Sequence, residues 1–148
     1  MKTENDFYHV GIDPSTGAVR RVVDKVAKVE LITEPRLAES FRLLLPLPDL
    51  EANYILSTEQ FAPRIETTGK RLTVRWDGPL SNAQGKYDLD VVVDIEVLDE
   101  TVQFRITVSN QTPHNLAEVW HAGMGGIMGL GDRKDTKILI PHFGMSAH

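Results

Sequence analysis

The sequence predicts an all-β protein, most simply a two-sheet antiparallel β-sandwich with its core between the sheets. Apolar and polar side chains alternate along residues 89–97 and 102–109, which is the period of strands with one buried face and one solvent-exposed face. No stretch shows a sustained helical period. The chain has 148 residues, the size of one domain with a substantial core, so residues 1–148 are predicted to form a single domain.

An N-terminal hairpin opens the predicted fold. Residues 7–12 are predicted to form a strand, residues 13–17 are dense in turn formers, and residues 18–24 return as the second strand. Residues 26–33 form a third candidate strand, which ends before Pro35.

The next part of the chain has a weaker pattern. Residues 36–45 fit either a helical face or a buried strand that is stopped by Pro46 and Pro48, and we favour a strand after a loop. Residues 49–63 keep no sustained period, so we expect a long irregular connection there.

A second hairpin is predicted from residue 65 to residue 76. Gly69 and Lys70 separate its two arms, and glycine tolerates the positive φ that a type II′ turn requires at its first central position. In the second arm, alternate residues including Trp76 share one apolar face, which we interpret as a core face. Residues 80–86 are predicted to be a polar loop.

The two alternating strands are expected to pair with each other across the turn at residues 99–100. Asp94 and Glu96 on the first strand are then predicted to lie opposite Arg105 and Gln103 on the second, a favourable cross-strand match.

Two further strands are predicted after this pair, at residues 116–122 and 136–140. A strand that arrives so late must pair within the existing sheets or with a partner that is missing. We therefore expect the chain to be the N-terminal part of a longer protein, with a complete small domain as the alternative.

Composition excludes several classes of function. The net charge is −5 and no basic run is present, so a broad interface for nucleic acid or anionic membrane is not expected. Without cysteine there is no disulfide, thiolate zinc site or thiol nucleophile. No signal peptide or membrane span is recognisable, so the sequence predicts a soluble protein, either cytoplasmic or exported with its signal removed.

The glycine-rich stretch 123–131 carries no phosphate-binding motif, because Met128 stands where a third glycine would be needed. We interpret it as close-packed backbone. The five histidines show neither HxH nor HExxH spacing, so no metal or other cofactor is predicted. A site assembled from His114, His121 and His142 is conceivable, but ordinary loop and surface histidines are the favoured interpretation.

The candidate functional cluster is Glu118 with Trp120. On a strand over residues 116–122 they point to one face and His121 to the other. A carboxylate beside an indole offers a flat apolar surface next to a hydrogen-bond acceptor, which suits a sugar ring. Trp120, Glu118 and His142 are therefore the candidate substrate-binding residues, although a core position for Trp120 is an equal alternative.

The order of four segments resembles the N-terminal β-supersandwich of the galactose-mutarotase-like superfamily, in the version that precedes the catalytic domain of large bacterial glycoside hydrolases. The segments are FYHVGIDPSTGAVRRVVD, LTVRWDGPL, VDIEVLDETVQFRITVSNQTPHNLAEV and GIMGLG…ILIPHFG. The resemblance implies a sandwich of long antiparallel strands that serves as a scaffold or accessory domain.

Three functional hypotheses follow. The first is an accessory or carbohydrate-binding domain of a glycoside hydrolase, whose partner is a downstream catalytic domain of the same polypeptide. The second is an epimerase-like enzyme with Glu118 and either His114 or His121 as acid and base. The third is a non-enzymatic assembly module, such as a homodimer, that pairs through an exposed strand.

Overall fold

A computed structural model describes residues 1–49 and 51–126, and these residues form a β-sandwich. The order is β1 (Lys2–Glu4), β2 (Tyr8–Ile12), β3 (Val19–Asp24), β4 (Val29–Glu30), η1 (Pro35–Leu37), β5 (Glu39–Leu44), β6 (Tyr54–Leu56), η2 (Ser57–Glu59), β7 (Arg64–Thr68), β8 (Arg71–Trp76), β9 (Leu80–Asn82), β10 (Gly85–Tyr87), β11 (Leu89–Val97), β12 (Val102–Asn110) and β13 (Glu118–Gly123). The predicted all-β class is confirmed.

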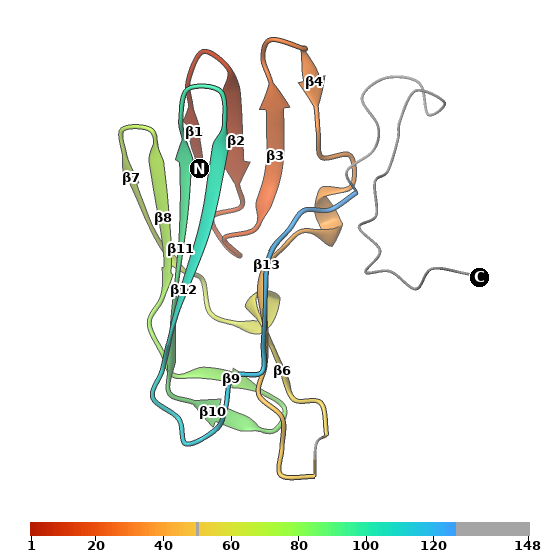
Figure 1. Cartoon of the computed structure of the whole chain (residues 1–148), viewed down its shortest axis with the longest axis vertical. Coiled ribbons are helices and arrows are strands. Elements are labelled where there is room, and N and C mark those ends of the chain that lie inside the picture. Colours follow the sequence, from red (N-terminus) through yellow and green to blue (C-terminus); the bar gives the residue numbers. More distant parts are fainter. Residues whose placement is uncertain (50, 127–148) are drawn as a thin grey trace, which may run out of the picture.

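One layer of the sandwich is a single sheet with the strand order β12-β11-β8-β7. The opposite layer consists of two smaller sheets, β1-β2-β3-β4 and β13-β5-β6, which lie one above the other in Figure 1. Every strand pair is antiparallel. The β9–β10 hairpin closes one end of the molecule (Figure 1).

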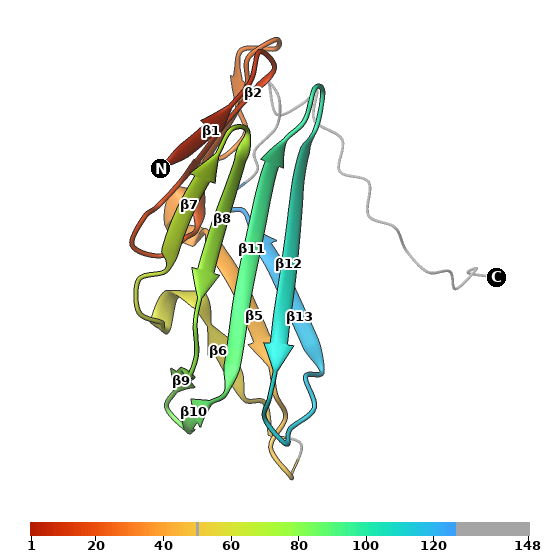
Figure 2. The ribbon, with the colours of Figure 1, turned by 90° about the vertical axis from the view of Figure 1, so that its left-hand side faces the viewer.

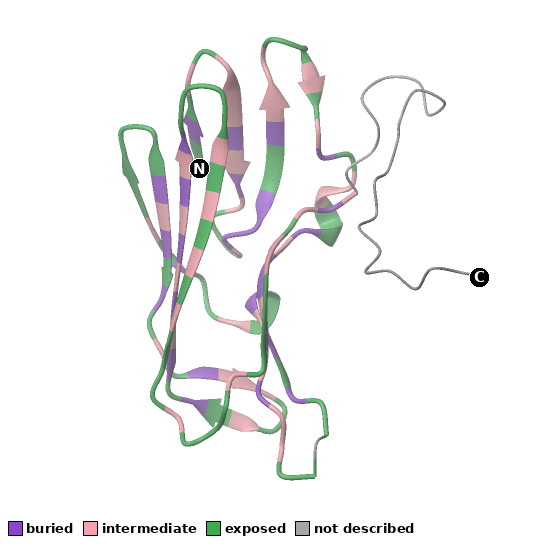
Figure 3. Cartoon of the chain, in the orientation of Figure 1, coloured by how far each residue is buried: buried purple, intermediate pink, exposed green. Residues whose placement is uncertain are grey.

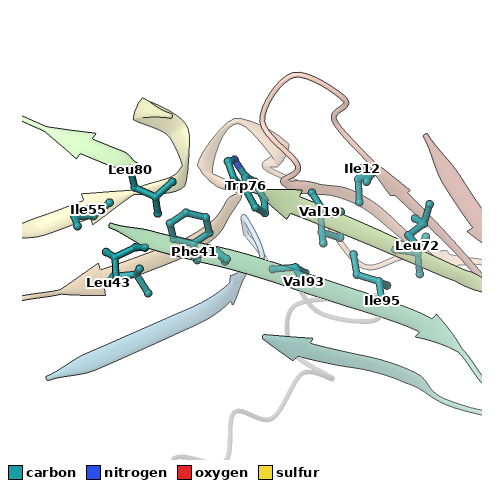
Figure 4. Close-up of a cluster of buried hydrophobic side chains, with 14 of the residues drawn as sticks. Ile12, Val19, Phe41, Leu43, Ile55, Leu72, Trp76, Leu80, Val93 and Ile95 are labelled. Atoms are coloured by element: carbon teal, nitrogen blue, oxygen red, sulfur yellow. The ribbon is translucent and has the colours of Figure 1, made fainter. Parts of the chain in front are cut away.

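The core lies between the layers because alternate residues of both face inward. Along β11 every second residue is buried, and the facing residues of β2, β3 and β5 are buried as well. Trp76 is completely buried and meets Phe41 edge to face at a centroid distance of 5.0 Å (Figure 4). The interpretation of Trp76 as a core residue is confirmed.

The pairing of the two long strands is also as predicted. Asp94 lies opposite Arg105, and Glu96 lies opposite Gln103. The closest cation to Asp94, however, belongs to β8, because Arg71 Nη2 lies 2.7 Å from its carboxylate. This ion pair lowers the pKa of Asp94, and a hydrogen bond from Thr73 acts in the same direction.

The two predicted hairpins form, but the third candidate strand is largely wrong. Of residues 26–33 only Val29 and Glu30 form a strand, and Ile32 adds an isolated β-bridge. The reason is a pair of local hydrogen bonds: the carboxylate of Asp24 accepts from the backbone N–H groups of Val26 and Ala27, which bends the chain into a turn. Val26 is consequently 69% exposed.

Two segments predicted to be irregular contain strands. The connection 49–63 includes β6, which pairs with β5, and the polar loop 80–86 is the β9–β10 hairpin. The side-chain oxygen of Asn82 accepts hydrogen bonds from the backbone of Gln84 and Gly85, so a polar residue closes this turn. The expected strand at 136–140 lies outside the described residues.

Candidate functional site

The candidate site is built on β13, the edge strand of the β13-β5-β6 sheet. Its register with β5 places Trp120 opposite Arg42 and Glu118 opposite Leu44. Because Phe41 and Leu43 of β5 are buried in the core, Arg42 and Leu44 face outward, and so do the residues paired with them. The sequence therefore assigned Glu118 and Trp120 correctly to one face.

Trp120 is solvent-exposed. Its exposed fraction is 60%, and most of the described part of β13 is exposed with it (Figure 3). The indole Nε1–H donates a 2.7 Å hydrogen bond to the Glu118 carboxylate. This bond fixes the ring beside the acid while the face of the indole remains accessible to a ligand.

An open pocket of about 450 Å³ borders the indole. It is lined by Glu39, Phe41, Arg42, Val119, Trp120, His121 and Gly123. All of these residues come from β5 and β13, so the pairing of two strands that are about 80 positions apart in the sequence creates the pocket.

Arg42 and Glu39 are charged residues of the pocket that form an ion pair with each other. Neither was predicted from the sequence. Arg42 Nη2 lies 3.0 Å from Glu39 Oε2, and its guanidinium carbon lies 5.7 Å from the ring centroid of Tyr54. The aromatic face and the carboxylate hold the guanidinium beside Trp120. The signal that could have found these residues is the pairing of β13 with β5, which no local pattern reveals.

His121 points to the other face of β13 and is half-buried. Its Nδ1 lies 3.0 Å from the Ser40 carbonyl oxygen, which only accepts, so Nδ1 carries the proton. The other ring nitrogen, Nε2, is buried without a partner in the described residues. Burial lowers the pKa of His121 and favours the neutral ring, although the hydrogen bond to Ser40 opposes this shift.

Of the other histidines that the sequence suggested, His114 does not line the pocket. His114 is exposed in the turn before β13, with its ring centroid 6.3 Å from that of Tyr87. His142 lies outside the described residues. Among residues 1–49 and 51–126, no group of three or more histidine, aspartate and glutamate side chains is arranged to hold a metal ion.

Gly125 and Gly126 of the 123–131 stretch lie against the segment before η1, whereas Gly123 lies against Glu39 of β5. The carbonyl oxygens of Gly125 and Gly126 accept hydrogen bonds from the N–H groups of Glu34 and Thr33. A Cβ on Gly125 would collide with the Glu34 carbonyl group. For these residues, the interpretation as close-packed backbone is confirmed.

No helix in the described part of the chain is long and apolar enough to cross a membrane. No protein-family model matches the sequence, and no curated protein is significantly similar to it.

Proposed function

We propose that this domain binds carbohydrate on the exposed face of β13 and acts as an accessory domain of a carbohydrate-active enzyme, a glycoside hydrolase. The observation that carries the proposal is the position of Trp120: a large apolar ring, 60% exposed, held by Glu118 at the border of an open pocket. A soluble domain gains nothing in stability by exposing such a ring, so a ligand or partner is the natural explanation.

The chemistry of the pocket suits a sugar. The C–H face of a pyranose stacks on an indole, and its hydroxyls donate to carboxylates and accept from guanidinium groups. Glu39 in the pocket and Glu118 beside the indole supply acceptors, and Arg42 in the pocket supplies donors. The Arg42–Glu39 ion pair leaves these two side chains with no net charge between them, which favours neutral over acidic sugars.

The epimerase-like alternative gains no support from the geometry. Glu118 faces outward, whereas His121 faces inward with its Nε2 buried. His114 is at the far side of the turn that precedes β13, beside Tyr87. General acid–base catalysis needs both groups within hydrogen-bond reach of one substrate.

Binding is tested by isothermal titration calorimetry with a panel of cello-, xylo-, manno- and galacto-oligosaccharides. We expect at least one of them to bind, and Trp120→Ala to weaken it at least tenfold, about 1.4 kcal/mol. Phe61→Ala is the matched control, because Phe61 is another exposed aromatic residue that does not line the pocket. Failure of the whole panel to bind, or an unchanged affinity in Trp120→Ala, would contradict the proposal.

The accessory role has its own test. It predicts that the gene continues beyond His148 into a barrel-like catalytic domain, and a native stop codon directly after His148 would count against it. Sugar binding and the accessory role can therefore fail separately.

A further inference from the structure

The free edge of β12 is the longest unpaired strand edge in the described part of the molecule. β12 pairs with β11 over nine residues in one continuous register without a bulge. No strand of residues 1–49 or 51–126 pairs with its other side, and Figure 2 shows β12 at the margin of its sheet. Along this edge, every second residue directs its backbone N–H and C=O groups outward.

The other described edges are short, charged or irregular. β1 and β6 have three residues each and β4 has two. β7 has five residues and carries Arg64 and Glu66, and β13 is interrupted by Ala122, whose φ is +55°. Shortness, charge and irregular backbone are devices that keep an edge from pairing with another chain.

β12 has none of these protections except one charge. Its sequence VQFRITVSN contains no proline, glycine or lysine, and only Arg105 is charged. Arg105 is thus the single charge on this strand, and Asp94, opposite it on β11, forms its ion pair with Arg71 of β8. The edge is therefore suited to pairing rather than protected against it.

The side chains of β12 also leave the core incomplete. The inward row Val102, Phe104, Ile106 and Val108 packs on the core but stays half-exposed, whereas Val91, Val93 and Ile95 of neighbouring β11 are buried. Figure 3 shows this alternation of half-buried and exposed residues along the strand. A strand added beside β12 would cover the half-exposed row.

We infer that β12 pairs with β12 of a second copy of this chain, antiparallel, about a two-fold axis through Ile106. This is the register that pairs all nine residues, because Ile106 is the midpoint of β12. It joins the two four-stranded sheets into one sheet of eight strands. An isologous contact of this kind closes on itself and gives a dimer rather than a fibre.

The side chains fit this register. Inward-facing residues pair with inward-facing residues of the second copy: Ile106 lies opposite the second Ile106, and Phe104 lies opposite Val108. Outward, Arg105 meets Thr107 of the second copy, so no like charges face each other. Shifting the axis by one residue to position 105 would place the two copies of Arg105 opposite each other, which is unfavourable.

The register is tested by cross-linking, because the chain contains no cysteine of its own. In Ile106→Cys the two thiols would face each other across the axis, within the Cα separation that a disulfide allows. In the control Thr107→Cys the two Cα atoms would be roughly 8 Å apart, beyond that limit. We expect mild oxidation to give a covalent dimer of Ile106→Cys only; equal or no cross-linking of both variants would overturn this register.

The dimer itself is tested by light scattering across a concentration series. We expect a dimer whose dissociation constant rises at least tenfold in Thr107→Lys at low salt, because the new lysine faces Arg105 of the second copy. High salt should reduce this effect. Thr67→Lys, the same change at an exposed position of β7, should leave the dimer intact. A monomeric wild-type chain at the highest soluble concentration, or equal effects of both lysine variants, would overturn the inference.

Discussion

Trp76 and Trp120 are the two tryptophans of this chain, and each lies on a strand, Trp76 on β8 and Trp120 on β13. Trp76 lies in the middle of the sandwich, with no exposed surface and Phe41 against its ring. Trp120 lies on the edge strand β13 of the opposite layer and is 60% exposed. The same side chain thus fills the core in one region and forms the candidate ligand platform in the other.

This difference shows what alternation along a strand does and does not determine. Alternation determines which residues share a face, but the neighbouring strands determine whether that face is covered. The inward face of β8 is covered by β2, β3 and β5, whereas the outward face of β13 has no described element over it. A functional surface in this fold therefore depends on the arrangement of the sheets.

Replacing each tryptophan by alanine should give the largest contrast between the two regions. Trp76→Ala removes a fully buried ring, and we expect a loss of about 3–5 kcal/mol in the free energy of unfolding. Trp120→Ala removes an exposed ring, and we expect a change within about 0.5 kcal/mol. Urea denaturation measures both values. Comparable losses would mean that Trp120 is a core residue and would remove the basis for a ligand platform.

Gly17 and Gly69 separate the effect of packing against Trp76 from the effect of backbone strain. Gly17 and Gly69 both have positive φ, +68° and +57°, so alanine at either position costs about 1–2 kcal/mol in strain. A Cβ on Gly17 would also lie 2.6 Å from the Trp76 ring, whereas nothing lies within 4 Å of one on Gly69. We expect Gly17→Ala to be more destabilising by about 1–3 kcal/mol. Equal losses in thermal or urea unfolding would show that the Trp76 ring adapts freely.

His121 gives a smaller, pH-dependent effect at the back of the candidate site. Burial lowers its pKa below the ordinary 6.5, so the unfolded chain takes up the proton more readily than the folded one. The neutral His121 ring therefore contributes fully to the free energy of unfolding above pH 6.5. This contribution is lost as the pH falls below 6.5, by at most about 1.4 kcal/mol per pH unit.

This effect is measured by comparing unfolding free energies between pH 7.5 and pH 5. We expect a shallower decline in His121→Asn, whose side-chain amide can still donate to Ser40. His114→Asn, at an exposed turn position, is the control and should retain the wild-type slope. A slope unchanged in His121→Asn would show that burial of this imidazole does not couple to stability.

The long strands could be predicted because their burial is one-sided and continuous. Burial alternates over all nine residues of β11 and over residues 102–109 of β12. The predicted match of Asp94 with Arg105 follows from the tight turn between the two strands. The β9–β10 hairpin was missed because Asn82 closes it with local hydrogen bonds and its strands are only three residues long. The strand predicted over residues 26–33 was too long because the Asp24 carboxylate accepts local hydrogen bonds from the backbone of Val26 and Ala27. These bonds favour a turn over extended backbone.

The candidate site was predictable only in part for a similar reason. Glu118 and Trp120 are two positions apart, so a strand necessarily places them on one face. Arg42 and Glu39 enter the pocket through the pairing of β5 with β13, which is a long-range contact without a local signal. The exposure of Trp120 also depends on that arrangement, which is why the sequence left its direction open.

The most direct test of carbohydrate binding at Trp120 uses the indole N–H signals in a ¹⁵N-correlated NMR spectrum. The two tryptophans give two such signals, one from Nε1 of Trp120, bonded to Glu118, and one from buried Nε1 of Trp76. Titration with the oligosaccharide that binds should shift the Trp120 signal in proportion to saturation and leave the Trp76 signal in place. A bound sugar that leaves the Trp120 signal unmoved would contradict the account.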